Sequence, residues 1–302
     1  MKRNLILFVA ACLLAPSAFA AEQRCTRGGP EVQKDLGGGY SVVIGPPADE
    51  SRKYLCRAAI VGPGGKVLFE VTESEAALNP ITGQDVNGDD KPDVVLETRA
   101  ARGQCCYGYY VVSLADPPGL VRAFSVSVPL TFEDRDGDGK VEISARETAF
   151  DSIEGLSTTD SPHPLVIFRL KGTTLYYVSQ AFWPEYEADI AQARGQISKG
   201  ELNDMLMSEM PDAKPTPPGQ QDPKDEKYLH IRGLVLQIAL DYLYGGRGQQ
   251  AWDTIYDMWR ENDRRRIRQV ILKGRTEGVL REITRQPESP AASPAAPPPP
   301  SQ

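Results

Sequence analysis

Two short acidic stretches hold the residue types and spacings best suited to chemistry in this chain. Between positions 134 and 142, carboxylate side chains recur at alternate positions with Gly137 and Gly139 between them. The side chains with this spacing are Asp134, Asp136, Asp138 and Glu142. Because glycine lets the backbone curl, such oxygens can converge on one point, which is how proteins bind a hard cation such as calcium.

A second acidic stretch lies upstream and has the same spacing, with Gly88 at its turn. At the seventh position of each stretch stands a lysine, where a calcium loop uses the backbone carbonyl and not the side chain. The predicted ligands are Asp85, Asn87, Asp89, Lys91 and Asp93 in loop one (residues 85–93), and Asp134, Asp136, Asp138, Lys140 and Glu142 in loop two (residues 134–142). With one more carboxylate and a second glycine, loop two is predicted to bind calcium more tightly.

Two other interpretations of the loops were weighed. Asp and Gly are common in turns that bind nothing, so the loops could be plain acidic turns. An EF-hand requires a glutamate at position 12 and a following helix. Position 12 is Leu96 in loop one and Ala145 in loop two, and strand-like runs follow both. The EF-hand is therefore rejected.

Each loop runs directly into an apolar segment, as in Asp85-Val-Asn-Gly-Asp-Asp-Lys-Pro-Asp93-Val-Val. This pattern resembles the FG-GAP and VCBS repeats of extracellular β-propeller and adhesion proteins. The resemblance covers residues 83–147 and, by spacing, 40–179. It implies calcium held by side chains at loop positions 1, 3, 5 and 9, and propeller-blade-like meanders. Three copies are too few to close a propeller, so we expect an open sheet.

The rest of the β region has a repeating organisation. Runs rich in β-branched and aromatic residues predict strands at 40–44, 54–61, 66–71, 94–98, 107–114, 120–128, 141–147, 165–170 and 174–179. Turns near residues 63, 117 and 171 recur at a constant interval. We therefore predict three copies of one unit, each a loop, a strand and a hairpin, and the first copy has no acidic loop.

The predicted fold class is α+β, with a repeat-built antiparallel β domain (21–180) followed by a small helical region (185–285). Apolar stripes at helical spacing occupy 231–242, 252–259 and 267–283. Gly245-Gly246 separates the first two stripes, and Asn262 or Asp263 is a candidate cap for the third. A Pro-rich linker (211–224) is predicted to interrupt the region. The Pro/Ala-rich tail (286–302) is predicted to be disordered.

The start of the chain resembles a secretory signal peptide over residues 1–20, with a small-residue cleavage site ending at Ala20. A lipoprotein acylated at Cys12 is the less favoured alternative. Cleavage removes Lys2 and Arg3, so the formal charge changes from −7 to −9. We therefore expect a periplasmic or secreted protein that does not bind nucleic acid and that has no transmembrane segment after cleavage.

Four cysteines remain after the predicted cleavage: Cys25, Cys56, Cys105 and Cys106. An even number in an oxidising compartment suggests two disulfides with three possible connectivities. Cys25–Cys56 with a vicinal Cys105–Cys106 bridge is favoured, and crossed pairing stays open.

The leading functional hypothesis is an exported, non-catalytic, calcium-binding β-repeat protein that serves as a scaffold or binding module in the cell envelope. Its expected partner is a protein or another envelope component. One alternative is an envelope metal-dependent hydrolase that uses the acidic loops. The other is a helical protein-interaction module carried on a β platform. No catalytic residue is predicted, because there are only two histidines and no Gly-x-Ser-x-Gly motif.

Overall fold

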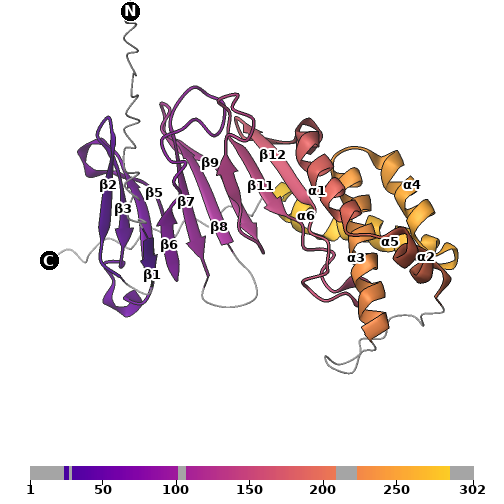
Figure 1. Ribbon diagram of the computed structural model, residues 1–302. Helices are drawn as coiled ribbons and strands as arrows, with labels where there is room; N and C mark the ends of the chain where they lie inside the picture. The colour runs from indigo at the N-terminus through magenta and orange to yellow at the C-terminus, as the bar shows by residue number, and fades with distance from the viewer. Residues whose placement is uncertain (1–23, 27–28, 101–106, 209–222, 286–302) are drawn as a thin grey trace, which may run out of the picture.

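A computed structural model describes residues 24–26, 29–100, 107–208 and 223–285 of the chain. Three antiparallel sheets stand side by side in a row, and the helices follow at one end of the row (Figure 1). This arrangement confirms the predicted α+β class. The predictions for the signal peptide, the tail and residues 211–222 of the linker fall outside the described residues. Within them, no helix is long and apolar enough to cross a membrane.

Each sheet is a simple meander whose strands follow their order in the chain. The first sheet consists of β2 (Val32–Gly37), β3 (Tyr40–Gly45), β4 (Cys56–Val61) and β5 (Val67–Glu73). The middle sheet consists of β6 (Glu75–Leu78), β7 (Asp93–Arg99), β8 (Tyr107–Ser113) and β9 (Gly119–Val126), with β1 (Arg24–Thr26) added beside β6. The third sheet consists of β10 (Thr131–Glu133), β11 (Glu142–Arg146), β12 (Leu165–Lys171) and β13 (Thr174–Tyr177). None of the three sheets closes on itself.

The repeat unit has four strands and not the three that the sequence predicted. The strand missed in each unit comes first, and in the second and third units it is only four and three residues long. Loop one joins β6 to β7 and loop two joins β10 to β11, so both occupy the same place in their units. In the first unit the corresponding connection is the tight turn Gly38-Gly39, whose φ angles of 61° and 82° favour glycine.

The middle sheet is buried on both faces, which explains the unbroken apolar run in β7. Successive side chains of a strand point to opposite faces. Val94 and Leu96 pack in a core shared with the first sheet, whereas Val95 packs in a core shared with the third sheet and the helices. Two separate apolar layers therefore join the three sheets.

The helical region contains α1 (Trp183–Gly195), α2 (Lys199–Met207), α3 (Pro223–Tyr244), α4 (Gly248–Met258), α5 (Arg264–Glu277) and α6 (Val279–Thr284). The last two residues of the predicted linker, 223 and 224, belong to α3. Proline suits the first turn of a helix, so Pro223 can begin α3. Asp263 directly precedes α5 but makes no capping bond to its backbone. Its carboxylate instead accepts hydrogen bonds from side chains, among them those of Arg266 and Trp259.

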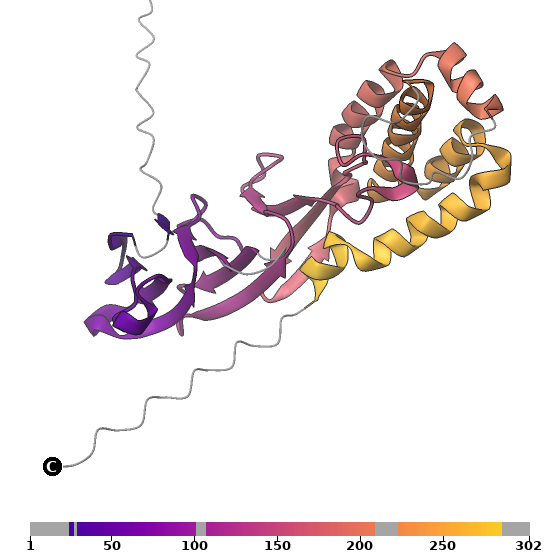
Figure 2. The same cartoon turned by 90° about the horizontal axis from the view of Figure 1, so that it is seen from below.

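The helices are not a separate unit, because one continuous core contains side chains of the third sheet and of α3, α5 and α6. Helices α5 and α6 also lead back along the molecule toward the sheets (Figure 2). At the end of α6, Arg122 of β9 donates to the carbonyl of Ile283 at 3.3 Å. Ser127 donates its backbone N–H to the carboxylate of Glu282 at 2.7 Å. The C-terminal helix therefore ties the helical end of the molecule to the middle sheet.

Candidate metal sites

The first aspartate of each loop holds the loop backbone in place. Asp85 accepts the N–H groups of Gly88, Asp89 and Asp90 at 2.7, 3.2 and 2.8 Å. In loop two, Asp134 accepts the N–H groups of Gly137, Asp138 and Gly139 at 2.8, 3.1 and 2.9 Å. The donors lie three, four and five residues after the aspartate in both cases. The two loops therefore have one backbone design, as their common sequence pattern predicted.

The ninth position of each loop is a buried carboxylate at the start of a strand. Asp93 is fully buried and accepts the N–H groups of Val86 at 2.8 Å and Asn87 at 3.0 Å. Glu142 is also fully buried and accepts the N–H of Arg135 at 2.9 Å. The pKa of Asp93 is raised to about 6, chiefly by burial and to a smaller extent by the negative charges of Asp89 and Asp85.

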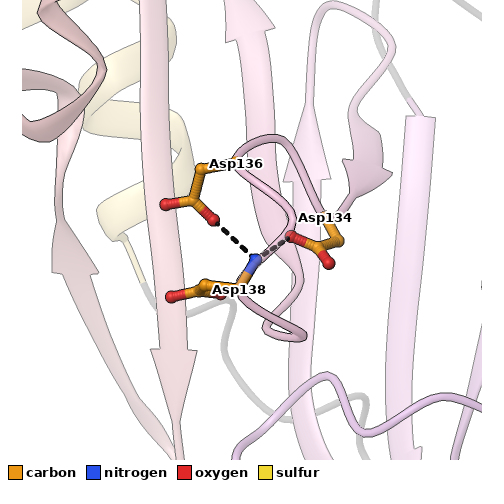
Figure 3. Close-up of side chains that lie close together, drawn as sticks. All are labelled: Asp134, Asp136 and Asp138. Carbon is orange, nitrogen blue, oxygen red and sulfur yellow. Dashed lines mark hydrogen bonds between the residues drawn. The ribbon is translucent and has the colours of Figure 1, made fainter.

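Loop two brings three of its predicted ligands together. Asp134, Asp136 and Asp138 each offer one carboxylate oxygen, and the three oxygens all lie within 4.8 Å of one another (Figure 3). The backbone N–H of Asp138 lies between the other two carboxylates and donates to both, at 3.1 and 3.2 Å. Such a group can hold a metal ion, and its all-oxygen character suits a hard cation.

The carboxylates of loop one lie less close together than those of loop two. Among the described residues, its carboxylates form no comparable group of three. At its centre, Asn87 directs its amide nitrogen toward Asp89 at 3.1 Å and toward Asp93 at 3.5 Å. The amide oxygen of Asn87 is buried and has no hydrogen-bond partner. A buried acceptor without a donor is unfavourable, and a bound cation would satisfy it.

The two lysines at the seventh positions are bound to the loops through their backbone N–H groups. Each donates its N–H to the aspartate two residues earlier, Lys91 to Asp89 and Lys140 to Asp138, both at 2.9 Å. The ammonium group of Lys140 also lies 3.0 Å from Asp138. These hydrogen bonds hold the pKa of Asp138 below its usual value.

Sequence reasoning missed Arg169 of β12, which stands directly opposite Glu142 in the strand pairing. Its guanidinium group lies 3.5 Å from Asp136 and 3.2 Å from Asp138, and its Nε donates to Glu142 at 2.6 Å. One side chain from another strand therefore contacts three of the four acidic ligands predicted for loop two.

The favoured disulfide is confirmed, since Cys25 and Cys56 are joined with an S–S distance of 2.06 Å. The bridge connects β1 of the middle sheet to β4 of the first sheet. Cys105 and Cys106 lie outside the described residues.

The two histidines lie on the helical side of the molecule and are already hydrogen-bonded. His163 pairs with Asp151 at 2.6 Å, and His230 pairs with Asp160 at 3.0 Å. Both aspartates belong to the segment between β11 and β12 and not to either loop. No observation on these histidines therefore supports the hydrolase alternative.

A polar cavity of about 460 Å³ is a second candidate site. Arg146 of β11, Asp189 of α1 and Gln237 of α3 are among the residues that line it. Arg146 donates to Asp189 at 3.1 Å and to the carbonyl of His163 at 3.1 Å, so its charge is already paired. The amide of Gln237 donates to both carboxylate oxygens of Asp241 at 2.8 Å. Arg146 and Asp189 are therefore paired with each other, and Gln237 is bonded to Asp241 behind the lining.

The buried Asp241 behind this cavity makes a pH-dependent contribution to stability. The pKa of Asp241 is raised to about 7, chiefly by burial and to a smaller extent by the negative charge of Asp189. Since the folded state holds this proton more tightly than the unfolded state, stability is lost as the pH rises from about 4 to about 7. We expect the wild type to lose about 2 kcal/mol of unfolding free energy between about pH 5.5 and about pH 8 that Asp241→Asn does not lose.

Urea unfolding of both proteins at the two pH values measures this difference. Asp253→Asn is the matched control, because Asp253 accepts a hydrogen bond from Gln249 in the same i, i+4 arrangement on the exposed face of α4. The control should parallel the wild type at both pH values. An Asp241→Asn curve that also parallels the wild type would show that the pKa of this carboxylate is not raised in the folded protein.

Comparisons of this chain with protein-family models, with curated proteins and with solved structures found no match.

Proposed function

We propose that this chain is an exported, calcium-binding β-repeat protein that acts as a non-catalytic scaffold or binding module in the cell envelope. The observation that carries the proposal is the repeated loop geometry. Two units place a buried carboxylate, a backbone-holding aspartate and intervening oxygen side chains at the same connection. Turns that served only to reverse the chain would not need a buried ninth-position carboxylate in both copies.

Calcium is the favoured ion because the side-chain oxygens of each loop come from flexible, glycine-containing backbone. Calcium accepts six to eight oxygen ligands in variable geometry, whereas magnesium demands a near-ideal octahedron and retains waters. The export part of the proposal is supported by the signal-like start and by the Cys25–Cys56 bridge, since disulfides persist in oxidising compartments. The FG-GAP and VCBS resemblance supports the same class.

The first test is a calcium-dependent melting temperature. At an affinity of about 0.1 mM, about 1 mM free calcium stabilises a folded protein by about 1.4 kcal/mol. We therefore expect the melting temperature in calcium to exceed that in chelator by roughly 3–6 °C. The double variant Asp89→Ala/Asp136→Ala, which removes one ligand from each loop, should lose this difference.

Asp35→Ala is the matched control for this test. Asp35 accepts the N–H of Gly37 at 2.8 Å in the turn of the first unit, where no acidic loop is present. This variant should keep the full calcium-dependent shift. Identical melting curves of the wild type in calcium and in chelator, with no heat of binding, would refute the calcium proposal.

A further inference from the structure

The two acidic loops differ in what neutralises them. In loop two, Arg169 contacts Asp136, Asp138 and Glu142, and only a quarter of its side chain is exposed. Lys140 adds a second positive charge, but its side chain is 61% exposed and contacts Asp138 alone. The guanidinium group offers several N–H donors in a fixed plane, so one arginine can serve several carboxylates at once. Part of the negative charge of loop two is therefore balanced by a cation that belongs to the chain and contacts three of its carboxylates.

Loop one has no such cation. In the part of the chain that the structure describes, no Lys or Arg side chain forms an ion pair with a carboxylate of loop one. The side-chain nitrogen that contacts both Asp89 and Asp93 is the uncharged amide of Asn87, which is 2% exposed. The charge of Lys91 acts on Asp89 without forming an ion pair with it. The unpartnered oxygen of Asn87 lies on the same amide group. Rotating the side-chain amide of Asn87 by half a turn would exchange its nitrogen and oxygen. The oxygen, which is a metal ligand, would then lie between the carboxylates of Asp89 and Asp93.

We propose that Arg169 acts as the resident cation of loop two, so that loop one is the loop that recruits calcium. Arg169 is thus the residue that determines which of two similar loops binds the metal. This inference rests on the proposed calcium-binding function. It reverses the order of affinity that ligand number alone predicts, because a metal entering loop two must first displace a guanidinium group that is held by three carboxylates.

The turn that follows β12 also supports loop one, but through its backbone. Immediately after β12, Gly172 donates its N–H to the carbonyl of Asn87 at 2.6 Å. The contact holds the centre of loop one against the β12–β13 hairpin without using the Arg169 side chain. A substitution at Arg169 should therefore release loop two for metal while leaving the support of loop one in place.

Calorimetric titration of the purified chain with calcium chloride tests the proposal. We expect the wild type to bind one calcium ion, with a dissociation constant that Asp136→Asn leaves unchanged and that Asn87→Ala weakens at least about tenfold. Arg169→Gln should bind a second calcium ion. The matched control is Lys140→Gln, which removes the exposed cation of the same loop and should still bind one.

Arg169→Gln leaves Glu142 buried without its partner and can therefore fail to fold in chelator. In that case, calcium should restore its melting transition, since the ion takes the place of the lost charge. Arg169→Lys provides a second variant, because a lysine is a point charge that cannot hold three carboxylates in one plane. We expect it to bind the second ion more weakly than Arg169→Gln and more tightly than the wild type.

The outcomes separate this inference from the function on which it rests. Two equivalent calcium sites in the wild type, unchanged by Arg169→Gln, would overturn the role of Arg169 and leave calcium binding intact. A single site that is lost in Asp136→Asn and kept in Asn87→Ala would also overturn it. If neither the wild type nor any variant binds calcium, the proposed function fails together with the inference.

Discussion

Replacing Glu147 by alanine should lower the free energy of unfolding by about 3–5 kcal/mol. Glu147 follows β11 and is fully buried. Its carboxylate accepts the N–H groups of Val279 at 2.7 Å and Leu280 at 3.1 Å, which are the first two residues of α6. It also accepts the N–H groups of Thr148 and Ala149, both at 3.0 Å. Alanine would leave these four backbone donors and the hydroxyl of Tyr244 without this acceptor and would detach the start of α6.

Urea unfolding and melting measure the loss, which corresponds to a fall in melting temperature of roughly 6–20 °C. Glu147→Gln keeps one acceptor oxygen without the charge and should lose less than Glu147→Ala. The control is Glu277→Ala, since Glu277 is exposed and lies 3.8 Å from Lys273, and it should change stability by at most about 0.5 kcal/mol. A Glu147→Ala variant as stable as this control would mean that the buried carboxylate does not hold α6.

Removing the Cys25–Cys56 bridge should have the next largest effect. The bridge closes a loop with a sequence separation of 31 residues, and the chain-entropy model assigns such a loop about 4 kcal/mol. Both cysteines are fully buried where the first and middle sheets meet. We expect Cys25→Ala/Cys56→Ala to lose about this free energy, with the first sheet most affected because the shared core and the bridge are what attach it.

Unfolding of the wild type and the double variant, with and without reductant, measures this contribution. Reductant should lower the stability of the wild type to near that of the double variant. The double variant should hardly respond, which attributes the effect to this bridge and not to Cys105 and Cys106. Amide hydrogen exchange should show faster exchange in β3 and β4 of the variant than in β12. Equal stability of the two oxidised proteins would refute the prediction.

Much of the β region could be predicted from local pattern. Each run of β-branched and aromatic residues that was assigned to a strand is a strand, because such residues fit a half-buried pleated surface. The strands that were missed are short or polar. In β2, Val32–Gly37, charged and amide side chains separate the apolar ones, and β10 has only three residues. Pairing with a neighbouring strand, which is not encoded locally, makes these segments strands.

The convergence of Asp134, Asp136 and Asp138 was also predictable, because their spacing lies within a few consecutive residues. Arg169 was not, since its place beside loop two depends on the register of β12 against β11. A signal was present in the sequence, however. Arg169 interrupts the apolar run from Leu165 to Leu170, and a charged residue in a buried strand usually has a partner. The role of Glu147 depends on contacts with residues more than a hundred positions away and had no local signal.

The position of β1 has a consequence for the order of assembly during synthesis. Arg24 pairs with Ala77 of β6, so β1 leaves the ribosome about 50 residues before the strand beside which it lies. At about 5–20 residues per second, this interval lasts roughly 3–10 seconds. Strand β1 can therefore take its final place only after the four strands of the first sheet have been synthesised. Cys25 lies in β1, so it reaches its final position next to Cys56 at the same stage. The closed bridge therefore reports that β1 has paired with a sheet that was synthesised later.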